Sequence, residues 1–133
     1  MAQHIHKFLP GESVTFKAEA AVTAGQLVVI SGDREVSPGT AASGAAWVGA
    51  AATDAAAGDN VLVLMGGVQK LTTTAAAVTA GDLVVAAAAG KVAKLAAVTT
   101  PTADDVTGTR SVVGIALTSV TSAGGTIEVK LVR

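Results

Sequence analysis

Apolar and polar positions alternate along two stretches of the chain, one near each end. Every second residue is apolar in Ser13–Glu19 (SVTFKAE), and Thr126–Val132 (TIEVKLV) follows the same pattern. A period of two residues is typical of a β-strand with one buried face. Two runs that are apolar throughout, Trp47–Ala51 and Val61–Met65, indicate further buried strands. The pattern therefore predicts a chain built from short strands.

A nine-residue string occurs twice, as AVTAGQLVV at Ala21–Val29 and as AVTAGDLVV at Ala77–Val85. Each copy predicts a Thr-Ala-Gly turn that leads into a buried strand rich in valine. Gly25 and Gly81 suit a turn with positive φ, a conformation that disfavours any residue with a Cβ atom. The repeat therefore indicates one turn-and-strand unit that is used twice.

The second half of the chain echoes the first beyond this string, because Val48-Gly49 returns as Val113-Gly114. The offset between the halves grows from 56 residues (21 to 77) at the string to 65 residues (48 to 113) at the Val-Gly pair. The increase predicts an insertion in the loop Ala96–Arg110. We expect two pseudo-repeats, at about 18–71 and 74–133.

These elements predict an all-β fold, a small barrel or sandwich of two pseudo-repeated lobes. We expect one β domain over residues 12–133, preceded by an extended N-terminal arm over residues 1–11. Gly66-Gly67 is expected to form a two-residue hairpin turn between the strands that flank it. Helix is the weaker alternative, since Gly58 and Gly90 interrupt the alanine-rich runs.

Composition narrows the possible functions. The net charge is -1, with 14% charged residues, so the sequence predicts no basic face for nucleic acid or for a membrane surface. No segment is long and apolar enough to span a bilayer, and the N-terminus lacks the apolar core of a signal peptide. Alanine and valine supply most of the apolar residues, so association with other copies is one way to gain burial.

Candidate catalytic chemistry is sparse. His4 and His6 are the two histidines, and a strand would place both on one face, where a metal contact is geometrically possible. No carboxylate precedes Glu12, so a partner-contacting tail is the preferred interpretation. Without a histidine in the body of the chain, no serine or threonine has a base to activate it. We therefore expect no catalytic residue, no metal and no cofactor.

The order of four strings carries a family resemblance. AVTAGQLVV, WVGAAATDAAAGDNVLVLMGGVQKL, AVTAGDLVV and VVGIALTSVTSAGGTIEVKLV together resemble the capsid cement or decoration proteins of tailed bacteriophages. The resemblance covers about Gly11 to Arg133. It implies a small barrel-like subunit without enzyme activity that binds the outside of an assembled shell of major capsid protein. It also implies a homo-oligomer, with symmetry favouring a trimer, on the outer virion surface after synthesis in the host cytoplasm.

Two segments outside the repeat are the candidate contact sites. The first is the arm, which can bind the capsid, a neighbouring copy or its own barrel. The alternative function is a free-standing β module for adhesion or carbohydrate binding, which usually stacks an exposed Trp or Tyr on a sugar. Trp47 is the one Trp in the sequence, there is no Tyr, and Trp47 lies in a run that predicts an apolar strand. The candidate arm residues are His4, Ile5, His6, Lys7, Phe8 and Leu9, and those of the inserted loop are Pro101, Asp104, Asp105 and Arg110.

Overall fold

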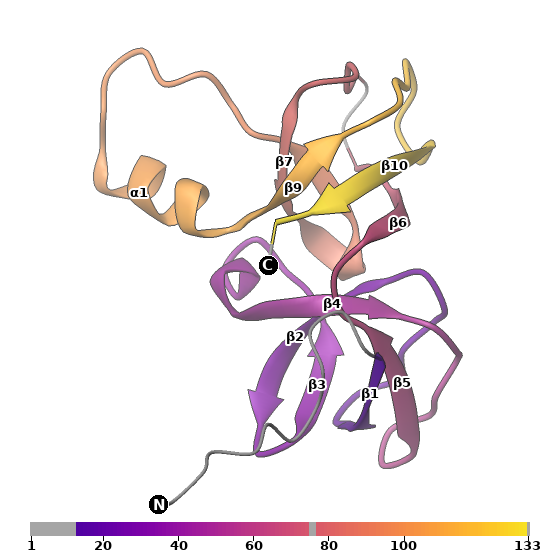
Figure 1. Cartoon of the computed structure of the whole chain (residues 1–133). Coiled ribbons are helices and arrows are strands. Elements are labelled where there is room, and N and C mark those ends of the chain that lie inside the picture. Colours follow the sequence, from indigo (N-terminus) through magenta and orange to yellow (C-terminus); the bar gives the residue numbers. More distant parts are fainter. Residues whose placement is uncertain (1–12, 75–76, 133) are drawn as a thin grey trace, which may run out of the picture.

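Ten short strands form two sheets that lie one above the other in the view of Figure 1. A computed structural model describes residues 13–74 and 77–132, apart from the side chain of Thr107. The expected N-terminal arm therefore lies outside the described residues. The first five strands make one sheet and the last five make the other, and we call these the first and second lobes.

The first lobe is a closed barrel with the strand order β1-β3-β2-β4-β5. Neighbouring strands run antiparallel except β1 and β3, which pair in parallel, and β1 also pairs with β5 to close the barrel. The strands are β1 (Ser13–Ala18), β2 (Leu27–Gly32), β3 (Glu35–Pro38), β4 (Trp47–Ala51) and β5 (Asn60–Leu64).

The second lobe is a five-stranded sheet with the order β6-β10-β9-β7-β8. Its strands are β6 (Val68–Thr72), β7 (Leu83–Ala86), β8 (Val92–Lys94), β9 (Val112–Ala116) and β10 (Thr126–Leu131). Short 3-10 turns occur at η1 (Gly44–Ala46) and η2 (Ala88–Gly90). The prediction of an all-β fold with two pseudo-repeated lobes of short strands is confirmed.

The expected hairpin at Gly66-Gly67 is wrong. Strand β5 pairs with β1 and β4, so both of its edges are occupied, and β6 pairs with β10 instead. The two glycines have φ angles of 89° and 70°, and they connect the first lobe to the second. A Gly-Gly pair therefore permits a change of direction here without pairing its two flanking strands.

The two copies of the nonapeptide make the same backbone bonds. The N–H of Gly25 donates to the oxygen of Ala51 at 2.8 Å, and the N–H of Gly81 donates to the oxygen of Ala116 at 2.7 Å. The φ angles of the two glycines are 86° and 96°, which confirms the predicted turn geometry. In each turn the backbone N–H of the threonine donates to the side chain of the one residue that differs, Gln26 in the first copy and Asp82 in the second. These two side chains therefore play the same role in the turn.

The repeated Val-Gly pair marks two places where strands approach closely. A Cβ atom on Gly49 would overlap the carbonyl oxygen of Leu64, and one on Gly114 would overlap that of Lys130. Each glycine lies beside a register shift, between β2 and β4 in the first lobe and between β7 and β9 in the second. The echo between the halves therefore records a steric requirement of the fold.

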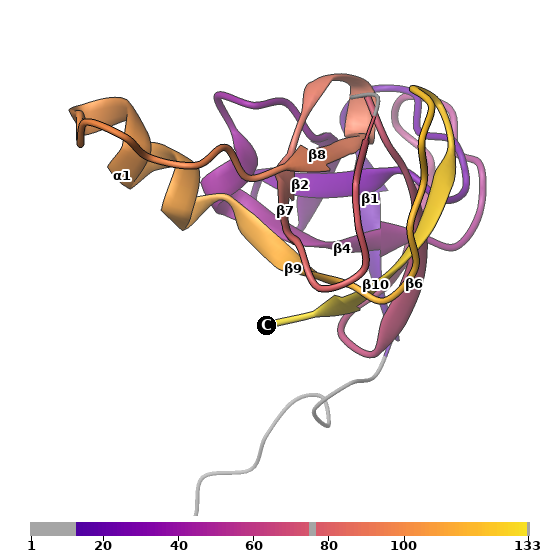
Figure 2. The ribbon, with the colours of Figure 1, turned by 90° about the horizontal axis from the view of Figure 1, so that it is seen from above.

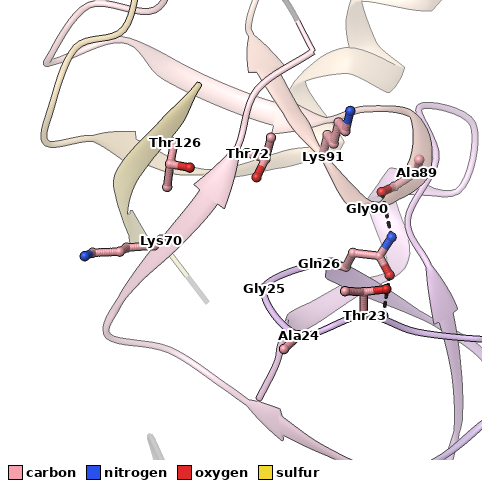
Figure 3. A pocket seen from close by; sticks show the side chains of 10 residues that line it. All are labelled: Thr23, Ala24, Gly25, Gln26, Lys70, Thr72, Ala89, Gly90, Lys91 and Thr126. Carbon is pink, nitrogen blue, oxygen red and sulfur yellow. Dashed lines mark hydrogen bonds between the residues drawn. The ribbon is translucent and has the colours of Figure 1, made fainter. Parts of the chain in front are cut away.

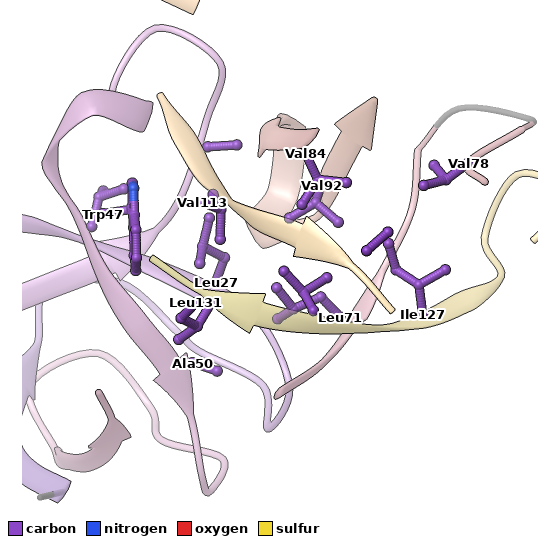
Figure 4. Packing of buried hydrophobic residues seen from close by; sticks show 14 residues of the cluster. Leu27, Trp47, Ala50, Leu71, Val78, Val84, Val92, Val113, Ile127 and Leu131 are labelled. Atoms are coloured by element: carbon purple, nitrogen blue, oxygen red, sulfur yellow. The ribbon is translucent and has the colours of Figure 1, made fainter. Parts of the chain in front are cut away.

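Two hydrophobic cores hold the lobes together. One fills the barrel of the first lobe, and the other lies between the lobes (Figure 4). Strand β2 contributes to both, because Val28 packs inside the barrel whereas Leu27 and Val29 pack into the shared core. The uninterrupted apolar run of this strand follows from its burial on both faces.

The insertion predicted at Ala96–Arg110 contains helix α1 (Ala103–Arg110), although the sequence analysis treated this segment as a loop. The carboxylate of Asp105 accepts hydrogen bonds from the backbone N–H of Thr102 and, at 2.9 Å, from its hydroxyl. The first of these bonds is one half of a capping box, and it satisfies a backbone group at the start of the helix. Local capping therefore forms a short helix where the hydrophobic pattern gives no helical signal.

Candidate interaction surfaces

The structure places one of the two segments that the sequence singles out. Helix α1 and its loop project from the side of the second lobe (Figure 2). Pro101 is exposed before the helix, Asp104 and Asp105 lie in its first turn, and Arg110 lies in its last turn. The arm residues His4, Ile5, His6, Lys7, Phe8 and Leu9 lie outside the described residues.

Charges on α1 follow the direction of the helix dipole. Acidic residues lie at its N-terminus and Arg110 at its C-terminus, an arrangement that stabilises a helix. Because Asp105 caps the helix, its role here is structural, whereas Asp104 presents an exposed carboxylate beside it. The charges of the inserted segment therefore stabilise its own helix, and Asp104 is an acidic side chain that stays exposed.

The outer face of the second lobe carries an apolar patch that the sequence analysis missed. Leu83 is 45% exposed on β7 and stands opposite the partly exposed Ile115 on β9. Val85 and Val112, which are also partly exposed, form the next pair along these two strands. We call these four residues, Leu83, Val85, Val112 and Ile115, the outer patch.

The outer patch has a buried counterpart in the first lobe. The equivalent pairs on β2 and β4 are Leu27 with Ala50 and Val29 with Trp47, at the same positions of the repeat. All four counterparts are buried in the core shared by the two lobes. The same set of positions is therefore an interface in the first lobe and a partly exposed surface in the second.

A pocket of about 410 Å³ lies between the lobes at the open side of the second sheet (Figure 3). One wall is β6 with the start of β10, and the other is the turn from β7 to β8. The turn of the first nonapeptide forms the base, where the side-chain amide of Gln26 donates to the oxygen of Ala89 at 3.1 Å. The lining residues are Thr23, Ala24, Gly25, Gln26, Lys70, Thr72, Ala89, Gly90, Lys91 and Thr126.

This pocket, which we call the seam pocket, exists because the second sheet does not close as the first one does. In the first lobe, β1 and β3 pair through Lys17 with Glu35 and Ala18 with Val36. In the second lobe, the described residues of the corresponding strands β6 and β8 are joined only by an isolated bridge between Thr73, just after β6, and Val92. The repeated strings do not predict this difference, because it depends on which residues face each other across the seam.

Chemistry of other kinds has little support among the described residues. In residues 13–74 and 77–132, no group of three or more His, Cys, Asp or Glu side chains could hold a metal ion. Over the same residues, none of the helices has the length and apolarity needed to cross a membrane. Trp47 is only 3% exposed, and its indole N–H donates to the oxygen of Val112 at 2.9 Å, so its ring has no open face for a sugar.

Comparison with known proteins identifies the family. The family model described as phage cement protein matches residues 8–131. The chain belongs to the phage cement protein family. The resemblance noted from the four strings is thereby confirmed, and the cement protein is a structural component of the virion that associates with the capsid. Proteins of such families are generally structural rather than enzymatic.

A solved structure shows the same fold. The crystal structure of the head fiber gp8.5 N base in bacteriophage phi29 is similar to this cement protein, with a TM-score of 0.59 and 19% sequence identity. The alignment covers 90% of this chain and 92% of that chain. At this identity the likeness concerns the fold of the two chains. No curated protein matches the sequence.

Proposed function

We propose that this cement protein binds the outside of an assembled shell of major capsid protein, stabilises it and has no catalytic role. The observation that carries the proposal is the family match, which spans residues 8–131. The location that follows is the outer virion surface, after synthesis in the host cytoplasm. The alternative of a sugar-binding module has less support, because the indole of Trp47 is buried.

The stabilising effect follows from mass action. A protein that binds the assembled shell better than its free subunits shifts the equilibrium toward the assembled state. Each copy can bind weakly, because contacts with several shell subunits at once raise the effective concentration of the remaining contacts. The inserted loop is a second candidate contact, with Pro101, Asp104 and Arg110 at the side of the second lobe.

The arm is the proposed anchor on the shell. Ile5, Phe8 and Leu9 are three apolar side chains within a short segment. Burying such a side chain contributes roughly 1.5–3 kcal/mol, from which the cost of ordering the arm is subtracted. Two other placements for the arm are a neighbouring copy and the barrel of its own chain, and the experiment below separates them.

Cosedimentation with empty shells tests the function and the anchor together. We expect the full chain to sediment with shells and to raise the temperature at which they disassemble. Deleting Ala2–Leu9 should leave a folded protein that no longer binds. A finer pair replaces by serine either Ile5, Phe8 and Leu9 or, as the matched control, His4, His6 and Lys7. We expect only the apolar triple variant to lose binding. Normal occupancy of shells by the truncated protein would show that the arm is not the anchor.

We further propose that the cement protein is a homo-oligomer, for which symmetry logic favours a trimer, and that the outer patch contributes to the contact. The support is internal to the chain, because the equivalent positions of the first lobe are already buried against another lobe. A chain whose core consists mainly of alanine and valine also gains burial by association.

Analytical ultracentrifugation of the free protein tests the oligomer. We expect a concentration-dependent oligomer that Leu83→Lys dissociates. The matched control is Leu62→Lys, because Leu62 is a similarly exposed leucine, at 36% against 45%, on a strand of the first lobe. If the two variants sediment alike, the outer patch takes no part in association.

A further inference from the structure

Among the described residues, the edge of β6 that faces away from β10 pairs with no strand beyond the single Thr73–Val92 bridge. The N–H of Leu131 on β10 donates to the oxygen of Gly67 at 2.9 Å. Together with the register of the two strands, this bond determines which peptide groups of β6 face β10. Peptide groups of successive residues in a strand point alternately to the two sides. The peptide groups that face the opposite side are those of Val68, Lys70 and Thr72, of which the last two residues line the seam pocket and the last adjoins the Thr73–Val92 bridge.

The first lobe shows what normally occupies this position. There the N–H of Lys17 donates to the oxygen of Arg34 at 2.9 Å, and the guanidinium of Arg34 donates to the oxygen of Thr15 at 2.7 Å. Backbone and side chain together therefore close the edge of β1 against the turn that precedes β3. The corresponding edge in the second lobe is that of β6, with Lys70 at the position of Thr15 and Thr72 at that of Lys17.

The second lobe lacks this closure because the residue at the position of the arginine is Gly90. Both residues have positive φ, 60° for Arg34 and 68° for Gly90, in the turn that leads to the third strand of each lobe. Glycine keeps the backbone conformation but provides no side chain to reach the carbonyl of Lys70. Across the seam the Thr73–Val92 bridge remains, in which the N–H of Thr74 donates to the oxygen of Val92 at 2.9 Å.

The charge of the seam pocket limits what can fill it. Lys70 and Lys91 line it, together with threonine hydroxyls, and none of its lining residues carries a carboxylate. Figure 3 shows the side chains of Lys70 and Lys91 both extending away from Gln26, in different directions. Glu128 stands opposite Lys70 in the ladder and lines an adjoining pocket of about 220 Å³ without forming an ion pair with it. A polar segment with carboxylate side chains complements this site.

The arm of the protein is a poor match for the same pocket. Its polar residues include His4, His6 and Lys7, which are neutral or cationic and do not complement two lysines. A segment from outside the chain is favoured instead. Recognition by strand addition combines main-chain hydrogen bonds for affinity with side-chain pockets for specificity, and the seam pocket offers both.

We propose that the seam pocket receives an extended, acidic segment of the capsid shell, which pairs with the exposed edge of β6 and places carboxylates near Lys70 and near Lys91. The inference rests on the proposed binding to shells. The incoming segment takes the place that the turn before β3 and the side chain of Arg34 occupy in the first lobe. The second lobe is therefore an incomplete copy of the first, which the shell completes.

Shell-binding measurements on two double variants test the charge requirement. Lys70→Gln with Lys91→Gln removes two positive charges from the pocket. Lys17→Gln with Lys130→Gln removes two exposed charges elsewhere. We expect the pocket variant to bind shells at least about tenfold more weakly and the control to stay within about twofold of the unmodified chain. Fluorescence of the buried Trp47 monitors folding of both variants. Equal affinities of the folded variants would overturn the proposal.

Amide hydrogen exchange tests the pairing at single residues. On shell binding, we expect the amides of Val68, Lys70 and Thr72 to become at least about tenfold slower to exchange. The amides of Gln69 and Leu71, which already face β10, serve as the internal control. If the first three amides exchange at the same rate with and without shells, no strand is added at β6.

The outcomes separate this inference from the function on which it rests. If the unmodified chain does not sediment with shells, the proposed function fails. If the unmodified chain and both double variants bind shells equally, the function stands and the seam pocket is not the contact. Loss of binding in the pocket variant, together with slowed exchange along β6, supports the proposal in full.

Discussion

The indole N–H of Trp47 donates a 2.9 Å hydrogen bond to the carbonyl oxygen of Val112, and these two residues occupy the same position in the two halves of the chain. Trp47 pairs with Val29 after a register shift on β4, and Val112 pairs with Val85 after the same shift on β9. The contact therefore links one half to its own repeat. It lies at the edge of the core that both lobes share.

Replacing Trp47 by phenylalanine removes this bond and part of the shared core. We expect the free energy of unfolding to fall by about 1–3 kcal/mol, because the carbonyl of Val112 loses its partner. Chemical denaturation followed by circular dichroism measures the change, with the exposed Leu62→Ala as a control. We also expect one transition, as for a single β domain over residues 12–133. Two separate transitions would contradict the single domain.

The two close strand approaches predict equivalent glycine substitutions. Gly49→Ala and Gly114→Ala each place a methyl group against a backbone carbonyl, so each should destabilise the fold by at least about 1–3 kcal/mol. Gly108→Ala is the matched control. Its Cβ would lie 3.7 Å from the side chain of Leu95, an ordinary contact, and alanine in a helix should stabilise by roughly 0.5–1 kcal/mol. In thermal melts, the midpoint temperature should therefore fall for Gly49→Ala and Gly114→Ala and rise for Gly108→Ala.

The repeated turns predict a matched pair of smaller losses. Gly25→Ala and Gly81→Ala meet no neighbouring atom within 4 Å, so their cost is conformational alone. Placing a Cβ in the left-handed region costs roughly 1–2 kcal/mol. Equal losses of unfolding free energy are expected, because the two turns make the same bonds. A loss at one position several times that at the other would show that the turns are not equivalent in energy.

Asp82 makes stability depend on pH. Its carboxylate accepts the N–H of Thr79 and lies 3.0 Å from the ammonium of Lys94, and these contacts lower its pKa from the usual 3.8. A lowered pKa means that the folded state favours the charged form, so the stabilisation is fully present above the unfolded value of 3.8 and is lost as the pH falls through the lower pKa of the folded state. Asp82→Asn should therefore melt below the unmodified chain near neutral pH and approach it in acid. A difference that stays constant with pH would contradict this assignment.

Much of the fold was predictable because its signals are local. The alternation in β1 and β10 and the apolar run of β4 predict strands that the structure contains. The changing offset between the halves predicts an insertion, and the structure has its helix and loop there. The family was predictable too, since the order of four strings spans most of the chain.

The errors arose where pairing partners decide the outcome. A Gly-Gly pair between two strands suits a hairpin, yet both edges of β5 are taken by strands distant in the sequence. The seam pocket was missed for a related reason. It depends on which residues face β6 in space. The effect of Gly90 at the position of Arg34 is visible only when corresponding strands of the two lobes are compared. The role of the arm stays a prediction.

Leu27 and Leu83 show what the local sequence determines and what depends on the tertiary structure. They hold the same place in two nearly identical nonapeptides, and the sequence alone predicts the same turn and strand for both, because backbone geometry follows local residues. Only the tertiary structure shows that Leu27 is fully buried between the lobes whereas Leu83 is 45% exposed. Burial depends on which surface lies opposite, and the second lobe covers the first while no described residue covers the second in the same way.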